Sequence, residues 1–299
     1  MGRFLLHFSV FLVVFAAVAA ATFLPDLGYA DAYYYRVSGP PARNLILGTS
    51  KAGQGIRPDV LEAELERPFR NFAFSLTVSP YGPTYARRIR EKLDHDGDGV
   101  AILAVDPWSV AAADPRVLPE GDALLGTLPS VTARPNVPYL WHYFERPYLN
   151  ILLRQSPARL HRDGWLEVHL AADDGSVARR TAFTLQSYRE RSAAWAVSPA
   201  RIESLDRTIS ELRESCHVVV VRLPVSPELM EVEEALMPDF DARINQLLAA
   251  YPEVGYLNLT PDNARYRYHD GVHLTPESAA EVTRRIAARI RSSAGRRAE

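Results

Sequence analysis

The pattern of apolar and polar positions after residue 43 alternates between short buried strands and amphipathic helices. Apolar runs with the length of strands are separated by longer stretches that have helical periodicity. The expected strands are 44–47, 69–76, 100–105, 217–225 and 255–259, and the expected helices are one that starts at 57 and those at 81–93, 199–214, 239–251 and 275–292. Strands that alternate with helices at this spacing predict an α/β fold with a doubly wound parallel sheet.

Residues 111–200 interrupt that regularity, because they mix prolines, tryptophans and polar residues without a clear period. We interpret them as a cap inserted over the edge of the sheet. The expected organisation is one main domain over residues 43–292 that carries this cap, followed by an arginine-rich solvated tail at 293–299.

The first 24 residues predict a membrane-spanning helix. The apolar run from Phe4 to Leu24 has about the length needed to cross a bilayer. Arg3 precedes it, so the positive-inside rule places the remainder of this single-pass cell-membrane protein on the extracytoplasmic side. A cleaved signal peptide stays open as the alternative, since Ala17-Val-Ala19 and Ala19-Ala-Ala21 offer small-residue cleavage sites. Both interpretations predict an exported domain.

Residues 25–42 are rich in tyrosine and proline. We expect them to form a juxtamembrane stalk whose aromatic side chains lie at the lipid interface.

Composition narrows the function classes. The net charge is −2, from 34 basic and 36 acidic residues. The chain therefore lacks the basic excess that is typical of proteins that bind nucleic acid. The single cysteine, Cys216, cannot form an internal disulfide, and its position at the start of an apolar strand predicts a buried thiol. No cofactor and no metal site are expected. Asp94-His-Asp-Gly-Asp-Gly99 imitates the start of a calcium loop, but the twelfth loop position would be an apolar strand residue, so a polar turn is expected.

Two segments 220 residues apart carry chemistry. Asn44-Leu-Ile-Leu-Gly-Thr-Ser50 places a serine where the first strand ends, at the edge of the sheet where open α/β folds bind ligands. His269-Asp-Gly-Val-His273 places Asp270 three residues before His273, so the carboxylate can orient an imidazole that reaches Ser50. The alternatives are that Ser50 only caps a helix and that Asp270 and His273 form a surface turn.

These residues resemble the SGNH or GDSL hydrolase superfamily, in particular its membrane-anchored cell-envelope branch, which includes the D-alanyl transfer and alginate O-acetylation proteins. Gly48-Thr49-Ser50 stands where that superfamily has Gly-Asp-Ser, and Asp270-Gly-Val-His273 matches its last block. The resemblance implies a flavodoxin-like three-layer fold with the catalytic residues Ser50, His273 and Asp270. It also implies that Asn71 to Thr77 helps to form the oxyanion hole.

The resemblance implies further site residues. Backbone N–H groups of Ser50 or Lys51 and of Leu76 would bind the oxyanion, with Ser75 beside the nucleophile. Asp106 and Trp108 stand where the family has an oxyanion asparagine block, so Trp108 or a cap residue such as Trp141 is expected to complete the substrate site. For the Lys51 side chain, a solvent-facing position is expected over contact with an anionic substrate group. His269 is a weaker candidate base.

The predicted function is a serine esterase or O-acyltransferase that acts on acyl esters of envelope glycans, with a membrane-bound O-acyltransferase as a candidate partner. The alternative is a catalytically weak glycan-binding or scaffold module, in which Trp108, Trp141 and Trp165 would stack on carbohydrate.

Overall fold

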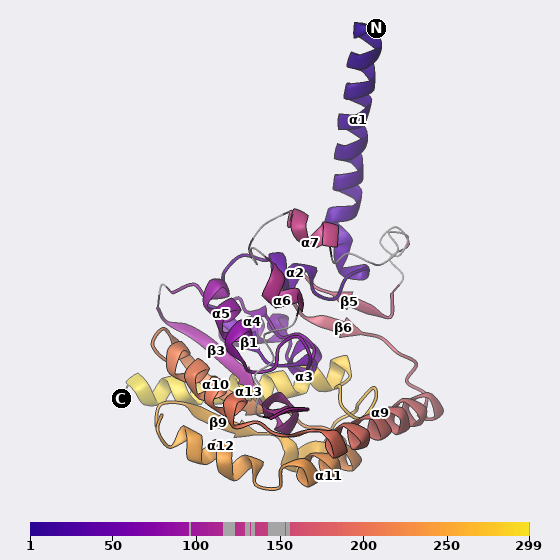
Figure 1. Ribbon diagram of the computed structural model, residues 1–299. Helices are drawn as coiled ribbons and strands as arrows, with labels where there is room; N and C mark the ends of the chain where they lie inside the picture. The colour runs from indigo at the N-terminus through magenta and orange to yellow at the C-terminus, as the bar shows by residue number, and fades with distance from the viewer. Residues whose placement is uncertain are drawn as a thin grey trace.

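A parallel sheet forms the centre of the computed structural model, which describes residues 1–95, 97–115, 123–128, 132, 135–142, 153 and 156–298 (Figure 1). The strands are β1 (Asn44–Leu47), β2 (Arg70–Asn71), β3 (Gly99–Ala104), β8 (Cys216–Arg222) and β9 (Gly255–Asn258). They are all parallel, in the order β2-β1-β3-β8-β9. The predicted doubly wound α/β fold is confirmed, and the strand order reverses between β1 and β3. Ligand sites in such sheets lie at that reversal, at the carboxyl ends of the strands.

Helices cover both faces of the sheet, because successive side chains of each strand point to opposite sides. On one face Leu45, Leu103 and Val220 share an apolar cluster with α5 (Pro83–Lys92), α10 (Pro199–Leu212) and α12 (Phe240–Leu248). On the other face, Ile46, Ile102 and Val221 share a second cluster with α3 (Ser50–Gly55), α4 (Pro58–Leu65) and α13 (Pro276–Ala298). The central strands are therefore buried on both faces, as their continuous apolar sequences indicate.

The strand expected at 69–76 is much shorter in the structure. Only Arg70 and Asn71 form β2. Beyond it, the hydroxyl of Ser79 accepts from the N–H of Phe74 and donates to the carbonyl of Gly48 (2.7 Å to the latter), so the segment follows the end of β1 as an irregular loop.

The cap region is more regular than its sequence indicates. It contains the helix α9 (Asp174–Ala194), which starts at an Asp173 side chain that accepts from the N–H of Ser176, and which packs on α11 (Pro227–Leu236). Both helices are missing from the expected elements. No residue of α9 is fully buried, and the contact of α9 with the third apolar cluster is made by the partly buried Leu185 and Tyr188, so its apolar stripe is too weak to have indicated a helix.

The remaining described elements are short. They are η1 (Leu24–Tyr29), α2 (Tyr34–Ser38), η2 (Pro107–Val110), β4 (Ala111–Ala112), α6 (Ala123–Thr127), α7 (Val137–His142), β5 (Ala158–Leu160), β6 (Leu166–Val168), β7 (Ala196–Val197) and η3 (Thr260–Arg265). The parts of the expected cap at 116–122, 129–131, 133–134, 143–152 and 154–155 lie outside the described residues.

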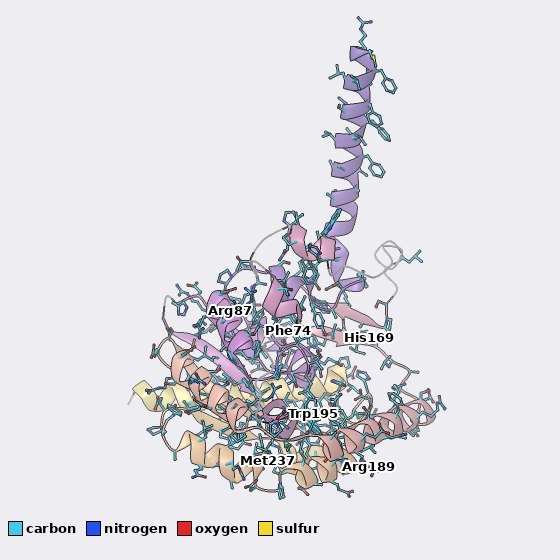
Figure 2. The ribbon with its side chains drawn as sticks, in the orientation of Figure 1. Phe74, Arg87, His169, Arg189, Trp195 and Met237 are labelled. Atoms are coloured by element: carbon cyan, nitrogen blue, oxygen red, sulfur yellow. The ribbon has the colours of Figure 1, made fainter. Side chains whose placement is uncertain are left out.

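The N-terminal helix α1 (Gly2–Phe23) projects from the globular part of the chain (Figures 1 and 2). Its segment Gly2–Ala21 has a mean hydropathy of 2.5 and is not buried by other residues. The helix is therefore long and apolar enough to span a membrane. A cleaved signal sequence has the same properties.

The stalk interpretation of residues 25–42 is wrong for most of that segment. Leu27, Tyr34, Tyr35 and Val37 are all less than 8% exposed and belong to the main core cluster. Arg36 is also buried and donates to backbone carbonyls of the neighbouring segments. These tyrosines are core residues, because a folded surface is available to cover them. At the other terminus, α13 continues to Ala298, so the expected tail is helical through that residue.

Candidate active site

A glycine turn at the end of β1 positions Ser50. Gly48 has a φ of +137°, and a Cβ at this position would lie 2.9 Å from both the Cβ and the carbonyl oxygen of Ala104. Only glycine therefore allows this turn to approach the end of β3 so closely. Thr49 continues in an extended conformation, and Ser50 is the first residue of α3. The serine lies at the strand-order reversal.

Ser50, His273 and Asp270 form a continuous hydrogen-bonded chain. The Oγ of Ser50 is 2.9 Å from Nε2 of His273. The Nδ1 of the same ring is 2.8 Å from Oδ2 of Asp270. A carboxylate at Nδ1 selects the tautomer that donates from Nδ1, which leaves Nε2 free to accept the serine proton. The expected proximity of Ser50 and His273 is thus present in the structure.

The site is partly open and strongly polar. The side chains of His273 and Asp270 are 19% and 22% exposed. Burial alone would raise the pKa of Asp270, but the charge of His273 and hydrogen bonds from the backbone of His273 and Val272 outweigh it and hold that pKa far below its usual range. Asp270 is therefore ionised at neutral pH and can stabilise a protonated imidazole.

The loop that carries Asp270 and His273 is held from two sides. Gly271 has a φ of +85°, and its carbonyl accepts from the N–H of Ser226 at the start of α11 (2.8 Å). On the other side, Arg180 of α9 donates to the carbonyl of His269 (2.9 Å). The His269 ring is buried, and burial lowers its pKa. The ring that contacts Ser50 belongs to His273.

Backbone N–H groups at the start of α3 are the candidate oxyanion donors. The N–H groups of Ser50 and Lys51 lie in the first turn of α3, where helical N–H groups have no intrahelical acceptor, and Thr49 makes no side-chain capping bond to them. The loop with Ser75 and Leu76 is tied to the same turn through Ser79 and Gly48. The Ser75 hydroxyl bonds to that of Thr77 at 3.0 Å.

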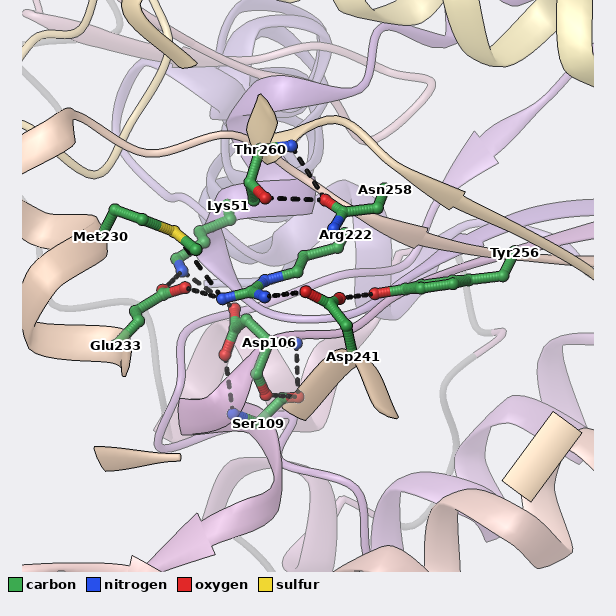
Figure 3. A network of polar contacts seen from close by, with 10 residues as sticks. All are labelled: Lys51, Asp106, Ser109, Arg222, Met230, Glu233, Asp241, Tyr256, Asn258 and Thr260. Atoms are coloured by element: carbon green, nitrogen blue, oxygen red, sulfur yellow. Dashed lines mark hydrogen bonds and ion pairs between the residues drawn. The ribbon is translucent and has the colours of Figure 1, made fainter. Parts of the chain in front are cut away.

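Lys51 lies in a buried network of charges next to this site (Figure 3). Its ammonium contacts Glu233 of α11 and lies 3.2 Å from Oδ2 of Asp106. The network continues from Glu233 to Arg222 of β8 (3.1 Å) and from Arg222 to Asp241 (2.6 Å). Tyr256 of β9 donates to Asp241 at the far end of this network.

The expectation of a solvent-facing Lys51 is therefore wrong. Its side chain is 5% exposed and that of Glu233 is completely buried. Burial would lower the pKa of Lys51, but Asp106 and Glu233 outweigh it and raise that pKa above its usual value. Lys51 is therefore charged at neutral pH, and the carboxyl groups of Asp106 and Glu233 are the partners that compensate this nearly buried charge.

Asp106 and Trp108 do not line an open surface in the structure. The Asp106 carboxylate accepts from the N–H of Ser109 (2.8 Å) and pairs with Lys51. Trp108 is 1% exposed and packs edge-on against Tyr188 of α9. Its indole N–H is also buried, and no acceptor for it is present among the described residues. Both residues are therefore buried, whereas the sequence predicted that they would contact the substrate.

The other two tryptophans that were expected to stack on carbohydrate, Trp141 and Trp165, differ in exposure. Trp165 is 3% exposed and donates its indole N–H to the carbonyl of Gln54 (2.9 Å), so it is not available for stacking on a glycan. Trp141 is 83% exposed, but it lies on α7 beside the base of α1, and the structure does not bring it to Ser50 (Figure 1).

Sequence reasoning missed Glu233 and Arg222 entirely. Glu231, Glu233 and Glu234 lie within four residues of one helix, and nothing in the sequence marks Glu233 as the buried one. Within the described ranges, the structure contains no group of three or more His, Cys, Asp or Glu side chains that could hold a metal ion.

No protein-family model matches this chain, and no curated protein sequence is significantly similar to it. Several solved structures show distant likeness to this chain, among them the following three. A family two carbohydrate esterase from Clostridium thermocellum in complex with cellohexaose has 10% identity and a TM-score of 0.38, over 86% of this chain and 66% of that chain. A carbohydrate acetylesterase family member from Sinorhizobium meliloti has 13% identity and a TM-score of 0.36, over 85% of this chain and 100% of that chain.

The third is an acetyl xylan esterase from the rumen bacterium Butyrivibrio proteoclasticus, with 9% identity and a TM-score of 0.35 over 87% of this chain and 65% of that chain. The chain thus spans slightly less than two thirds of the length of the first and third of these proteins.

Proposed function

We propose that this protein is an extracytoplasmic, membrane-anchored serine esterase or O-acyltransferase that acts on acyl esters of envelope glycans. The observation that carries the chemistry is the chain of contacts from Ser50 through His273 to Asp270, at 2.9 and 2.8 Å. A hydroxyl bonded to an imidazole that a carboxylate orients is the arrangement of an activated nucleophile. The glycan substrate and the membrane-bound acyltransferase partner are expectations from the family resemblance.

The mechanism follows from the contacts of Ser50 and Asp270 with the two ring nitrogens of His273. Nε2 of His273 accepts the Ser50 proton while Oγ attacks the ester carbonyl carbon, and the carbonyl oxygen becomes an oxyanion. N–H groups of Ser50 or Lys51 and of Leu76 stabilise that charge. Collapse of the intermediate breaks the ester bond, and the alcohol leaves with the proton from His273. A second hydroxyl then takes the acyl group from Ser50 by the reverse steps.

The acceptor decides the type of enzyme. Water as acceptor makes the protein an esterase, and a sugar hydroxyl makes it an O-acyltransferase. We propose that α1 stays attached and places the site outside the cytoplasm. A reporter fused after Glu299 should then be active only outside the cytoplasm, and cytoplasmic activity would contradict this orientation.

The test uses the full chain in mild detergent with an acetylated oligosaccharide, and follows both released acetate and acetate transferred to an unmodified oligosaccharide. We expect turnover in the wild type and loss of nearly all of it in Ser50→Ala. Ser292→Ala, which changes an exposed serine of α13, is the matched control and should retain activity. The ratio of transfer to release distinguishes an O-acyltransferase from an esterase.

A second candidate is a catalytically weak glycan-binding or scaffold module. Asp106 favours it, because a carboxylate that pairs with Lys51 cannot donate to an oxyanion as the family's asparagine does. Removal of one oxyanion donor costs about 10²–10³ in rate. Release of acetate by both the wild type and Ser50→Ala at only the rate of the uncatalysed reaction would support this module over the enzyme.

A further inference from the structure

The helix α7 presents an apolar face that nothing in the described part of the chain covers. Val137 and Trp141 are 61% and 83% exposed. They are four residues apart, so they lie on the same face of the helix. Beyond residue 23, only two other described residues, Leu153 and Phe183, are large hydrophobic side chains with comparable exposure. Exposed apolar faces of this kind mark binding surfaces.

The opposite face of α7 is fixed to the segment that follows α1. Tyr139 is 1% exposed, and its hydroxyl donates to Oδ1 of Asp31 at 2.7 Å. Its ring packs edge-on against Tyr34, with the ring centroids 5.6 Å apart. The same Asp31 oxygen accepts from the N–H of Tyr34 at 2.6 Å. These buried contacts hold α7 in one orientation.

The position of α7 relates its exposed face to the membrane. Figure 1 shows α7 beside the lower end of α1, on the side of the domain from which α1 projects. The helix α1 ends at Phe23, and Asp31, which binds Tyr139, follows after η1. A helix of this length places its domain-side end at the boundary of a bilayer with a hydrocarbon core of about 30 Å. When α1 spans the membrane, α7 is thus on the side of the domain that is nearest the bilayer.

We propose that the Val137 and Trp141 face of α7 docks on the outer surface of the lipid bilayer. Tryptophan favours the membrane interface, where its ring is buried among lipid groups and its N–H stays hydrated. The inference rests on the proposed membrane anchor, because α1 sets the height of α7. Together, α1 and α7 attach the domain at two points, which prevents rotation about a single tether and fixes the direction in which the Ser50 site faces.

The test is quenching of tryptophan fluorescence by brominated lipids, with the full chain reconstituted in phosphatidylglycerol and phosphatidylcholine vesicles. Bromines near the headgroup should quench the wild type, and Trp141→Phe should lose at least half of that quenching. The other three tryptophans remain as internal references, since Trp108 and Trp165 are buried and Trp195 is half-buried. Bromines at the end of the acyl chains should quench Trp141 less than shallow ones.

A matched control places a tryptophan on the other exposed aromatic position. Phe183 lies on α9 and is 77% exposed, so the double variant Trp141→Phe and Phe183→Trp tests an exposed ring away from α1. We expect no recovery of quenching in this variant. Equal quenching in the wild type and Trp141→Phe would overturn the proposal, and so would emission that responds to added oligosaccharide and not to brominated lipid. Flotation with the vesicles after carbonate washing reports α1 separately, so a failed anchor is distinguished from an undocked α7.

Discussion

Ser50 and Lys51 are consecutive residues whose side chains lie in opposite environments. The Ser50 side chain faces a partly open site, where it bonds to His273. The Lys51 side chain enters a dry network, where Glu233 and Asp106 hold its charge. One side of the turn keeps polar groups near solvent and available for reaction. On the other side, the charged groups are buried, and each is stabilised by the opposite charges of its neighbours.

The difference teaches where mutations should act. A hydrogen bond between partly exposed groups adds only about 0.5–1.5 kcal/mol to stability, so the Ser50 side can change with little effect on the fold. Removal of one member of a buried ion pair leaves an uncompensated charge and costs about 3–5 kcal/mol. The two regions should therefore separate activity from stability, although they meet at adjacent residues.

The largest expected effect is on the rate, from Asp270→Asn. The amide retains the shape of the side chain but favours the wrong imidazole tautomer, so we expect kcat to fall by about 10⁴ while the free energy of unfolding at neutral pH falls by only about 2 kcal/mol. Steady-state kinetics with an acetyl ester and denaturant unfolding of the same preparation check both values. Full activity in this variant would show that Asp270 has no catalytic role.

The next effect is on stability, from Glu233→Ala. This change leaves Lys51 and Arg222 without their shared partner, and we expect the free energy of unfolding to fall by about 3–5 kcal/mol. Glu234→Ala changes an exposed residue of the same helix and should stay within about 0.5 kcal/mol of the wild type. Denaturant unfolding in mild detergent measures both. Similar values for the two variants would show that the buried network contributes little.

A smaller effect concerns the free energy of unfolding at acidic pH. The folded pKa of Asp270 is lowered below the unfolded value of about 3.9, so its ionisation stabilises the fold above that pH and the contribution is lost as pH falls through the folded pKa. We expect Asp270→Asn to reduce the loss of stability between pH 5 and pH 2 by about 2 kcal/mol. His273→Ala should reduce it as well, because the histidine charge lowers that pKa. Parallel curves for the wild type and both variants would contradict this coupling.

The smallest expected effect concerns the reactivity of the buried thiol of Cys216. Burial raises the pKa of Cys216 to about 11. Because the thiolate is the reactive form, a thiol reagent at pH 8 should modify Cys216 at least ~10-fold more slowly than it modifies the chain unfolded in denaturant. Equal rates would mean that the start of β8 is open to solvent.

The sequence predicted the parts of the molecule that depend on local patterns. Alternating strands and helices indicated the sheet, and Ser50, Asp270 and His273 each lie in a short segment with a turn that could be read directly. Side-chain contacts that depend on how distant segments pack could not be predicted from these local patterns. The burial of Tyr34 and Tyr35 depends on a surface that distant segments create, and Glu233 differs from its neighbours only in the direction it faces.

The central claim is that Ser50 is a nucleophile that His273 activates, and the most direct measurement is labelling of the full chain by a serine-directed fluorophosphonate, with the modified residue located by peptide mass spectrometry. We expect one adduct, on Ser50, with no labelling of Ser50→Ala and labelling of His273→Ala slower by several orders of magnitude. An adduct on another serine, or equal labelling rates in the wild type and His273→Ala, would contradict it.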